Sequence, residues 1–379
     1  MQRDKIFLFL ILTLIIIIFY PVKWLLRNPH EMGFNRVNFD LARDTTPEKE
    51  SVYSKGIYIT FRTAASKRMD ELIDLVERTE LNAVVIDIKD YTGLIPFNTD
   101  NDLINQIGSE KDYIPDIRGL INKLHQERIY VIARIAVFED NFLPIKRPDL
   151  ALKIRGNNLW RDFKGLTWVD PASQEVWDYT IALAKEAAKI GFDEINLDYI
   201  RFPSDGNTSE IIYPFWDYKT PKKEIIRQFF EYFSQRVKPI GVFVSADLFG
   251  LTLTSTNDLN IGQWLEDAAL YFDYICPMVY PSHYPEGYEG FTNPAIQPYE
   301  VIYKALLTGQ ERLASVSAEI QGGSAAKLRP WLQDFDLGAN YDAEMVNLEK
   351  KAVYDAGAYG WLLWNPKNIY TEDALIKEE

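Results

Sequence analysis

Two aspartates, Asp198 and Asp247, each lie near the end of a short apolar segment that is typical of a buried strand. Neighbouring strands lie about 4.8 Å apart, so carboxyl groups at their ends can approach the roughly 5–5.5 Å that a retaining glycosidase requires. In such a pair one carboxylate attacks the sugar or activates water, while the other stays protonated and donates to the leaving oxygen. These residue types, at the ends of successive segments, therefore indicate cleavage of a glycosidic bond by paired carboxylates.

The two aspartates are expected to play different roles. Asp198 is the candidate nucleophile or general base. Asp247 is the candidate acid, because Leu248 and Phe249 offer it apolar cover and such cover raises the pKa of a carboxyl group. A structural role is the alternative for each: Asp247 would cap a loop or pair with a base, and Asp198 would form an ion pair with Lys89, Arg134 or Arg201.

Other polar and aromatic residues fall late in the predicted strands or in the loops after them. Strand side chains alternate, which places Asn196 on the face of Asp198 and Lys89 on the face of Asp87. Charges that point into a barrel are costly unless paired, so we expect Asp87 and Lys89 to form a supporting ion pair. Asp334 is expected either to contact sugar hydroxyls or to cap a loop. The predicted substrate-binding residues are Asp87, Lys89, Arg134, Asn196, Arg201, Tyr280, His283, Trp331, Asp334 and Trp364.

The elements that must position these residues alternate along the chain. Segments rich in β-branched and aromatic residues predict strands at 56–60, 83–89, 130–138, 194–201, 242–248, 274–280, 328–335 and 359–364. Amphipathic segments between them predict helices that include 66–79, 114–128, 174–190, 221–237 and 341–356. Strands that alternate with helices in this number predict a parallel α/β fold, the (β/α)₈ TIM barrel.

A doubly wound open sheet is the alternative fold. It would need a glycine-rich phosphate turn after the first strand, whereas residues 60–65 read Thr-Phe-Arg-Thr-Ala-Ala. In a barrel the carboxyl ends of all strands form one rim, so the polar residues at the strand ends are expected to converge there.

The N-terminal segment differs from the rest of the chain. Residues 6–20 are almost uninterruptedly apolar and basic residues flank both ends, which predicts a signal anchor over residues 1–27. A polar stretch at 28–54 reads as a linker, followed by a barrel domain over 55–379. We therefore expect a single-pass protein of the cell membrane with an extracytoplasmic domain. Secretion after signal cleavage is the alternative.

Composition narrows the chemistry further. A net charge of −14 repels phosphate backbones, so nucleic acid is not expected as a partner. The chain has 3 His and 1 Cys and no zinc-binding spacing, nucleophile elbow or Walker loop. We therefore expect no metal and no cofactor.

Six ordered strings carry a resemblance to a known family. They occupy 56–60, 85–90, 197–203, 245–250, 277–284 and 329–335, and they resemble the putative glycosyl hydrolase domain of bacteria, domain-of-unknown-function family 4015. The similarity extends from about residue 55 to 370. It implies a TIM barrel related to α-amylase-like and other retaining glycosidases, often behind an N-terminal anchor. The resemblance does not identify a substrate; a carbohydrate polymer or oligosaccharide is the expected partner.

The sequence departs from better-known sugar hydrolases at two places. In the α-amylase superfamily an Arg precedes the fourth-strand nucleophile by two positions and the fifth strand supplies a Glu acid, where this chain has Asn196 and Asp247. In the chitinase-type pattern the last acid is a Glu, where this chain has Ile200.

We expect a hydrolase acting on a cell-envelope or environmental polysaccharide. The alternatives are a non-catalytic carbohydrate-binding barrel at the cell surface and a polysaccharide lyase or transglycosylase.

Overall fold

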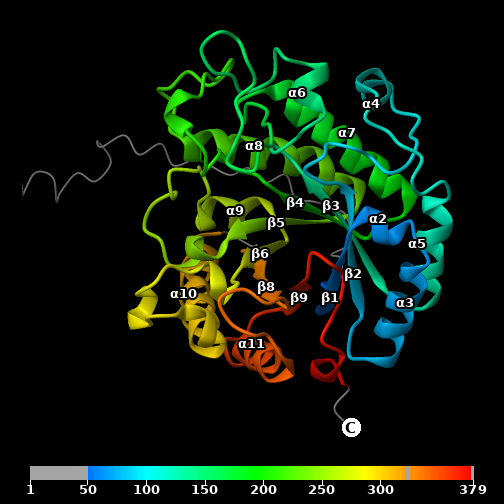
Figure 1. Cartoon of the computed structure of the whole chain (residues 1–379), viewed down its shortest axis with the longest axis vertical. Coiled ribbons are helices and arrows are strands. Elements are labelled where there is room, and N and C mark those ends of the chain that lie inside the picture. The colour runs from blue at the N-terminus through cyan, green and yellow to red at the C-terminus, as the bar shows by residue number, and fades with distance from the viewer. Residues whose placement is uncertain (1–49, 321–324, 377–379) are drawn as a thin grey trace, which may run out of the picture. The chain divides into compact units, whose positions relative to one another are not determined.

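The computed structural model describes residues 50–320 and 325–376, so the predicted anchor and nearly all of the predicted linker lie outside the described residues. The strands form one parallel sheet in the order β5-β4-β3-β2-β1-β9-β8-β6-β7, and the additional pairing of β5 with β6 closes it into a barrel. The strands lie in the centre of Figure 1 and the helices form a ring around them. The predicted (β/α)₈ class is confirmed. The strand bounds are β1 Ser54–Ile59, β2 Ala83–Lys89, β3 Tyr130–Ala136, β4 Glu194–Asp198, β5 Phe243–Phe249, β6 Tyr274–Met278, β7 Lys327–Leu328, β8 Trp331–Gln333 and β9 Gly360–Trp364.

Each of the predicted amphipathic segments contains a helix. The segment 174–190 is helical over its full predicted length, between Ser173 at its start and Gly191, which has a φ of 120°, at its end. Five helices, α2, α4, α6, α9 and α10, lie outside the predicted helical segments. The helix bounds are α2 Phe61–Ala64, α3 Arg68–Arg78, α4 Asp102–Ile107, α5 Ile117–Gln126, α6 Leu143–Lys146, α7 Gln174–Ile190, α8 Lys222–Val237, α9 Leu265–Tyr271, α10 Pro298–Glu319 and α11 Ala343–Asp355.

Several of the predicted strands are shorter in the structure, and for two of them the cause is a specific residue. The predicted strand 328–335 is split into β7 and β8 around Pro330, which has no N–H to donate to a neighbouring strand. The predicted strand 194–201 ends at Asp198, because Tyr199 adopts a φ of 53°. That left-handed conformation is incompatible with a continuing strand.

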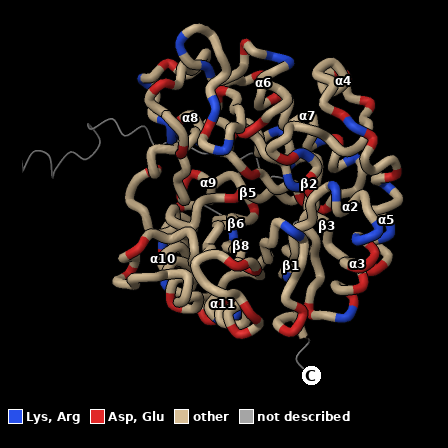
Figure 2. Tube along the Cα trace, in the orientation of Figure 1, with Lys and Arg blue, Asp and Glu red and all other residues tan. Residues whose placement is uncertain are grey.

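The two ends of the barrel interior differ in their polar groups. At the amino end Arg329 donates to Glu194, and both side chains are fully buried. At the carboxyl end a larger set of charged residues converges, as described below. Beyond the barrel, Figure 2 shows acidic and basic residues interspersed over the outer helices and loops on the face in view. Within the described residues, no helix is long and apolar enough to cross a bilayer.

Closure of the barrel between β1 and β9 depends on Gly360. Its φ is 91°, and a Cβ there would lie 2.2 Å from the carbonyl oxygen of Ser54. We expect Gly360→Ala to lower the free energy of unfolding by about 2–3 kcal/mol, because a strained φ and a backbone clash add up. Urea denaturation measures this. Gly241→Ala is the matched control: its φ is 88° with nothing within 4 Å, so it should lose only about 1 kcal/mol. Equal losses in the two variants would contradict the role of the clash.

Candidate active site

The register of the parallel strands brings the polar residues together. Arg134 of β3 lies beside Asp87 of β2 on one side and beside Asn196 of β4 on the other. Asn196 in turn lies beside Ser245 of β5. One register position therefore carries polar side chains across four neighbouring strands, and Asp198 and Asp247 come two residues later on β4 and β5. The interior of the barrel is polar at this level because of this alignment.

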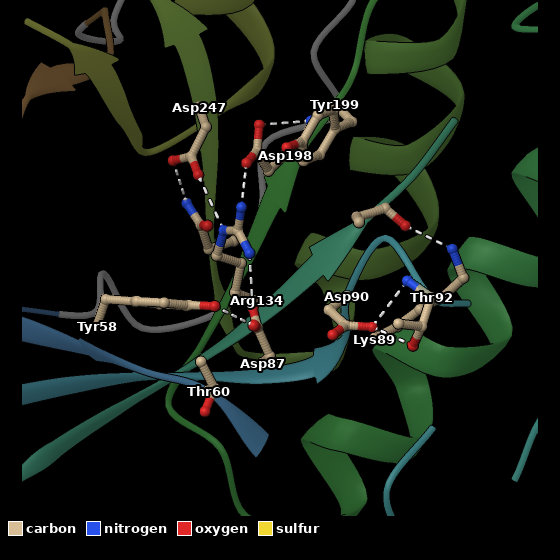
Figure 3. Close-up of polar contacts among 12 residues, drawn as sticks. Tyr58, Thr60, Asp87, Lys89, Asp90, Thr92, Arg134, Asp198, Tyr199 and Asp247 are labelled. Atoms are coloured by element: carbon tan, nitrogen blue, oxygen red, sulfur yellow. Dashed lines mark hydrogen bonds and ion pairs between the residues drawn. The ribbon is translucent and has the colours of Figure 1, made fainter. Parts of the chain in front are cut away.

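A single guanidinium group, that of Arg134, binds three carboxyl groups (Figure 3). Its Nη1 donates to Asp87 Oδ1 at 2.6 Å, its Nη2 donates to Asp198 Oδ2, and its Nε lies 3.6 Å from Asp247 Oδ2. The Tyr58 hydroxyl, from β1, donates to the second oxygen of Asp87. The predicted convergence of Asp198 and Asp247 at the ends of adjacent strands is therefore observed. The ion pair between Asp198 and Arg134 corresponds to one of the structural alternatives foreseen for Asp198.

Asp247 is enclosed by protein donors. Its Oδ1 accepts hydrogen bonds from Asn196 Nδ2 and Trp331 Nε1, both at 2.8 Å, and its side chain is 1% exposed. Asp198 has a more open position, with 8% of its side chain exposed. Of the two carboxyl groups, that of Asp198 is therefore the more accessible to solvent.

The environment of the cluster favours the protonated forms of the buried carboxyl groups of Asp247 and Asp87. Three buried carboxyl groups share one cation, and an unpaired buried anion is costly. Burial and the neighbouring Asp198 raise the pKa of Asp247 to about 8, although Arg134 opposes the shift. Burial also raises the pKa of Asp87, again against Arg134. Burial alone would lower the pKa of Arg134, but Asp198 and Asp87 hold it well above its usual value. Asp247 therefore has the protonation expected of an acid at neutral pH.

Backbone strain lies next to Asp198. Tyr199 has a φ of 53°, a left-handed conformation that costs a bulky residue of order 1–3 kcal/mol. Its N–H donates to Asp198 Oδ1 at 2.5 Å. The turn at Tyr199 thus orients the Asp198 side chain and supplies one hydrogen bond to its carboxylate.

The predicted ion pair between Asp87 and Lys89 is wrong. The register between β2 and β3 shifts between these two residues, so strict alternation does not hold there. Lys89 Nζ instead lies 2.8 Å from Asp140 Oδ2 and donates to the carbonyl of Ala136 at 2.6 Å. Asp87 is paired with Arg134 inside the barrel.

Three further predicted residues lie around the mouth of the barrel. Arg201 is buried, with its guanidinium 4.8 Å from the ring centroids of Trp168 and Phe249. Burial, together with the nearby Asp247 and Asp198, holds the pKa of Tyr280 well above its usual value. His283 is exposed and packs edge-on against Tyr280 with ring centroids 5.2 Å apart.

The remaining predicted residues support the site from within the fold. Trp331 is buried and its indole binds Asp247, so its ring faces are packed by protein. Trp364 stacks on Tyr58 with ring centroids 3.9 Å apart. Asp334 accepts hydrogen bonds from the backbone N–H and the hydroxyl of Thr371, which is the loop-capping alternative.

Two residues at or near the charged cluster, Tyr58 and Glu139, were not predicted as site residues from the sequence. Tyr58 had no signal beyond its inward position in the first strand. Glu139 directly follows the predicted strand 130–138, so the rule that singled out Asp198 applied to it equally. Within the described residues, no group of three or more His, Cys, Asp or Glu side chains is arranged to hold a metal ion.

A separate hollow of about 420 Å³ lies away from these residues. Its lining includes Asn82, Tyr130 and Asp193, which stand at or just before the amino ends of β2, β3 and β4. In a barrel of this class the chemistry takes place at the carboxyl ends, so this hollow is not the candidate site.

Comparison with solved structures supports the fold. The glycoside hydrolase domain of PgaB (BpsB) from Bordetella bronchiseptica is 13% identical, with a TM-score of 0.58 over 86% of this chain and 99% of that one. The alpha-L-fucosidase isoenzyme 2 from Paenibacillus thiaminolyticus is 14% identical, with a TM-score of 0.53 over 86% of this chain and 47% of that one. At such identities the likeness concerns the fold alone.

Three further comparisons concern the amino-acid sequence. A hypothetical protein from Ruminiclostridium thermocellum is 38% identical over 50% of this chain and 96% of that one, with a TM-score of 0.46. No curated protein matches the chain. The family model described as "Putative glycosyl hydrolase domain" matches residues 56–370, and the chain belongs to this family, DUF4015.

Proposed function

We propose that this protein hydrolyses O-glycosidic bonds of a cell-envelope or environmental polysaccharide, with Asp198 as nucleophile or general base. The observation that carries the proposal is the convergence of Asp87, Asp198 and Asp247 on the guanidinium of Arg134 at the carboxyl end of the barrel. A barrel that needed only stability would more easily fill this space with apolar side chains, because buried ion pairs contribute little net stability. A reacting sugar, in contrast, needs both an anion and a proton donor.

The second carboxyl group of the reaction must hold a proton. Asp247 is a candidate because burial and Asp198 keep its pKa near 8. In this role it would donate through Oδ2, since Oδ1 accepts two hydrogen bonds. Arg134, Arg201, Tyr280 and His283 would contact or orient the sugar.

The proposal extends to where the enzyme works. Residues 1–27 would anchor the chain in the cell membrane and 28–54 would link the anchor to an extracytoplasmic barrel, with secretion after cleavage as the alternative. The support is the apolar run 6–20 between basic flanks.

A panel of polysaccharides and aryl glycosides tests the function. We expect wild type to release products that have gained the mass of one water per bond cleaved. Unsaturated products would indicate a lyase, and products joined to an acceptor sugar a transglycosylase. Binding of a glycan without any cleavage would favour a non-catalytic carbohydrate-binding barrel and overturn the proposal.

A further inference from the structure

Glu139 lies three residues beyond the end of β3, whose last residue, Ala136, pairs with Asp198. Beyond the strand, Val137 N–H donates to the carbonyl of Asp198 at 2.9 Å and Phe138 N–H donates to that of Tyr199 at 3.3 Å. Glu139 is the following residue, and its backbone bridges to Trp168 on the other side. The chain that carries Glu139 therefore runs alongside the strained turn that aims Asp198.

Glu139 differs from the other buried acids in having no donor. It is 4% exposed, and its carboxyl group forms no hydrogen bond or ion pair with any residue of the described ranges. Every other buried acidic side chain there has at least one such partner. These residues are Asp87, Asp90, Asp140, Asp162, Asp170, Glu186, Glu194, Asp198, Asp247, Asp334 and Glu349. Because buried polar groups are normally hydrogen-bonded, the unpaired carboxyl group of Glu139 is available to a ligand.

Burial favours the protonated form of Glu139. Burial raises its pKa to about 8, with Asp162 and Asp198 adding to the shift and Arg201 and Lys164 opposing it. Arg201 itself forms no ion pair with a carboxylate among the described residues, and it donates to the Phe202 carbonyl and the Ser204 hydroxyl, both at 3.1 Å. A cation that stays apart from Glu139 lowers the pKa without removing the proton near neutral pH.

Asp247 is less accessible than Glu139 as a donor to a substrate. Its Oδ1 is occupied by Asn196 and Trp331, its Oδ2 faces Arg134, and its side chain is 1% exposed. Glu139 has neither oxygen engaged. It also shares its neighbourhood with Lys164, a residue whose charge acts on exposed His283 at the barrel mouth as well.

We propose that Glu139 is the general acid and donates its proton to the leaving oxygen, while Asp198 acts at the anomeric carbon as nucleophile or general base. This rests on the proposed glycosidase function and deepens it. The glycosidic C–O bond breaks, its electron pair goes to the leaving oxygen, and that oxygen takes the proton of Glu139. Asp198 either bonds to the anomeric carbon or accepts a proton from an attacking water. In the first case water then attacks the anomeric carbon, its proton goes to Glu139, and the bond to Asp198 breaks with Asp198 leaving as a carboxylate. In the second case the oxygen of that water bonds to the anomeric carbon, after which Asp198 releases its proton to solvent and Glu139 takes one from solvent. Asp247, on this assignment, positions Arg134 and Asp198.

The test compares Glu139→Gln with Asp247→Asn on two substrates of the sugar that wild type cleaves: an oligosaccharide, and a dinitrophenyl glycoside whose leaving group needs no proton. We expect Glu139→Gln to lower kcat/KM on the oligosaccharide by about 10²–10⁴-fold, and by less than about tenfold on the dinitrophenyl glycoside. The acid is active in its protonated form, so wild-type activity should fall as pH rises above about 8, and this alkaline limb should vanish in the variant.

Glu186→Gln is the matched control, because Glu186 is a buried glutamate of α7 that already accepts from Lys189, and it should leave both rates unchanged. A difference infrared spectrum, wild type minus Glu139→Gln, checks the protonation without any turnover. We expect a protonated-carboxyl band at about pH 6 that is lost by about pH 10.

Three outcomes would overturn the assignment. They are full activity of Glu139→Gln on the oligosaccharide, the leaving-group pattern in Asp247→Asn instead, and absence of the infrared band. Failure of wild type to cleave any glycoside would refute the proposed function itself, which separates that failure from failure of the assignment.

Discussion

Asp198→Asn is expected to abolish turnover of any glycoside that wild type cleaves, with kcat reduced on the order of 10⁴-fold or more. The amide keeps the shape of the side chain but supplies neither the anion that attacks nor the base that activates water. Neutralising one partner leaves Arg134 paired with Asp87 at 2.6 Å, so we expect the barrel to remain folded. Initial rates on the substrate found in the glycan panel, with circular dichroism of the same preparation, provide the measurement.

The control for this variant is Asp70→Asn. Asp70 pairs with Lys123 at 2.7 Å on the outer surface, where both side chains are at least half exposed. It should retain wild-type rates. Binding of the glycan, measured by calorimetry, should survive in Asp198→Asn. Retained full activity of Asp198→Asn would remove Asp198 from the chemistry.

Arg134→Met is expected to lower the free energy of unfolding by about 3–5 kcal/mol near neutral pH, and to abolish activity as well. Methionine fills much of the space, but it leaves Asp87, Asp198 and Asp247 without their shared cation. Removing one partner of a buried ion pair costs more than the pair contributed, because the remaining charge stays desolvated. Urea denaturation of the two proteins side by side measures the loss.

The loss in Arg134→Met should depend on pH in a defined direction. Burial already raises the pKa of Asp87 and Asp247, and removal of the cation that opposes the shift would raise both further. In the unfolded chain the pKa of these groups is about 4. Between that pH and the higher pKa of the folded state, the folded variant binds more protons than the unfolded one. Stability then falls as pH rises through this interval, and the deficit against wild type should be larger at pH of about 8 than at about 5.

Arg134→Lys serves as the comparison for that experiment. It keeps a positive charge but not the planar fork that reaches three carboxyl groups. We expect it to recover part of the stability and to reduce the pH dependence. A loss of the same size at both pH values in Arg134→Met would mean that Arg134 does not neutralise charge in the cluster.

Much of the barrel was predictable because its strands are buried on both faces. Every residue of β2 is buried, and such strands read as continuous apolar runs. Helix α7 was predictable in full because Ser173 and Gly191 mark its ends. Helix α10 was not, because Gly309 interrupts its pattern, and only the packed structure shows that a Cβ there would lie 2.8 Å from Leu253.

Within the site, the residues were easier to predict than their partners. Asp198 and Asp247 were visible as acids at the ends of apolar segments. The pairing of Lys89 with Asp140 was not, because it depends on a register shift between neighbouring strands that are far apart in the sequence. Glu139 was within reach of the same rule as Asp198, but its lack of a donor is a property of the folded chain.

The class of fold, the end of the barrel where polar residues collect and the carboxyl groups available there were all predictable from the amino-acid sequence. These follow from local hydrophobic pattern and from the period of two in strand side chains. The folded barrel was needed to show which carboxyl groups share Arg134, which one is enclosed by Asn196 and Trp331, and which one has no hydrogen-bond donor. The reason is physical: protonation and pairing depend on burial and on distances of a few ångströms between residues from different strands, and those distances exist only once the barrel has closed.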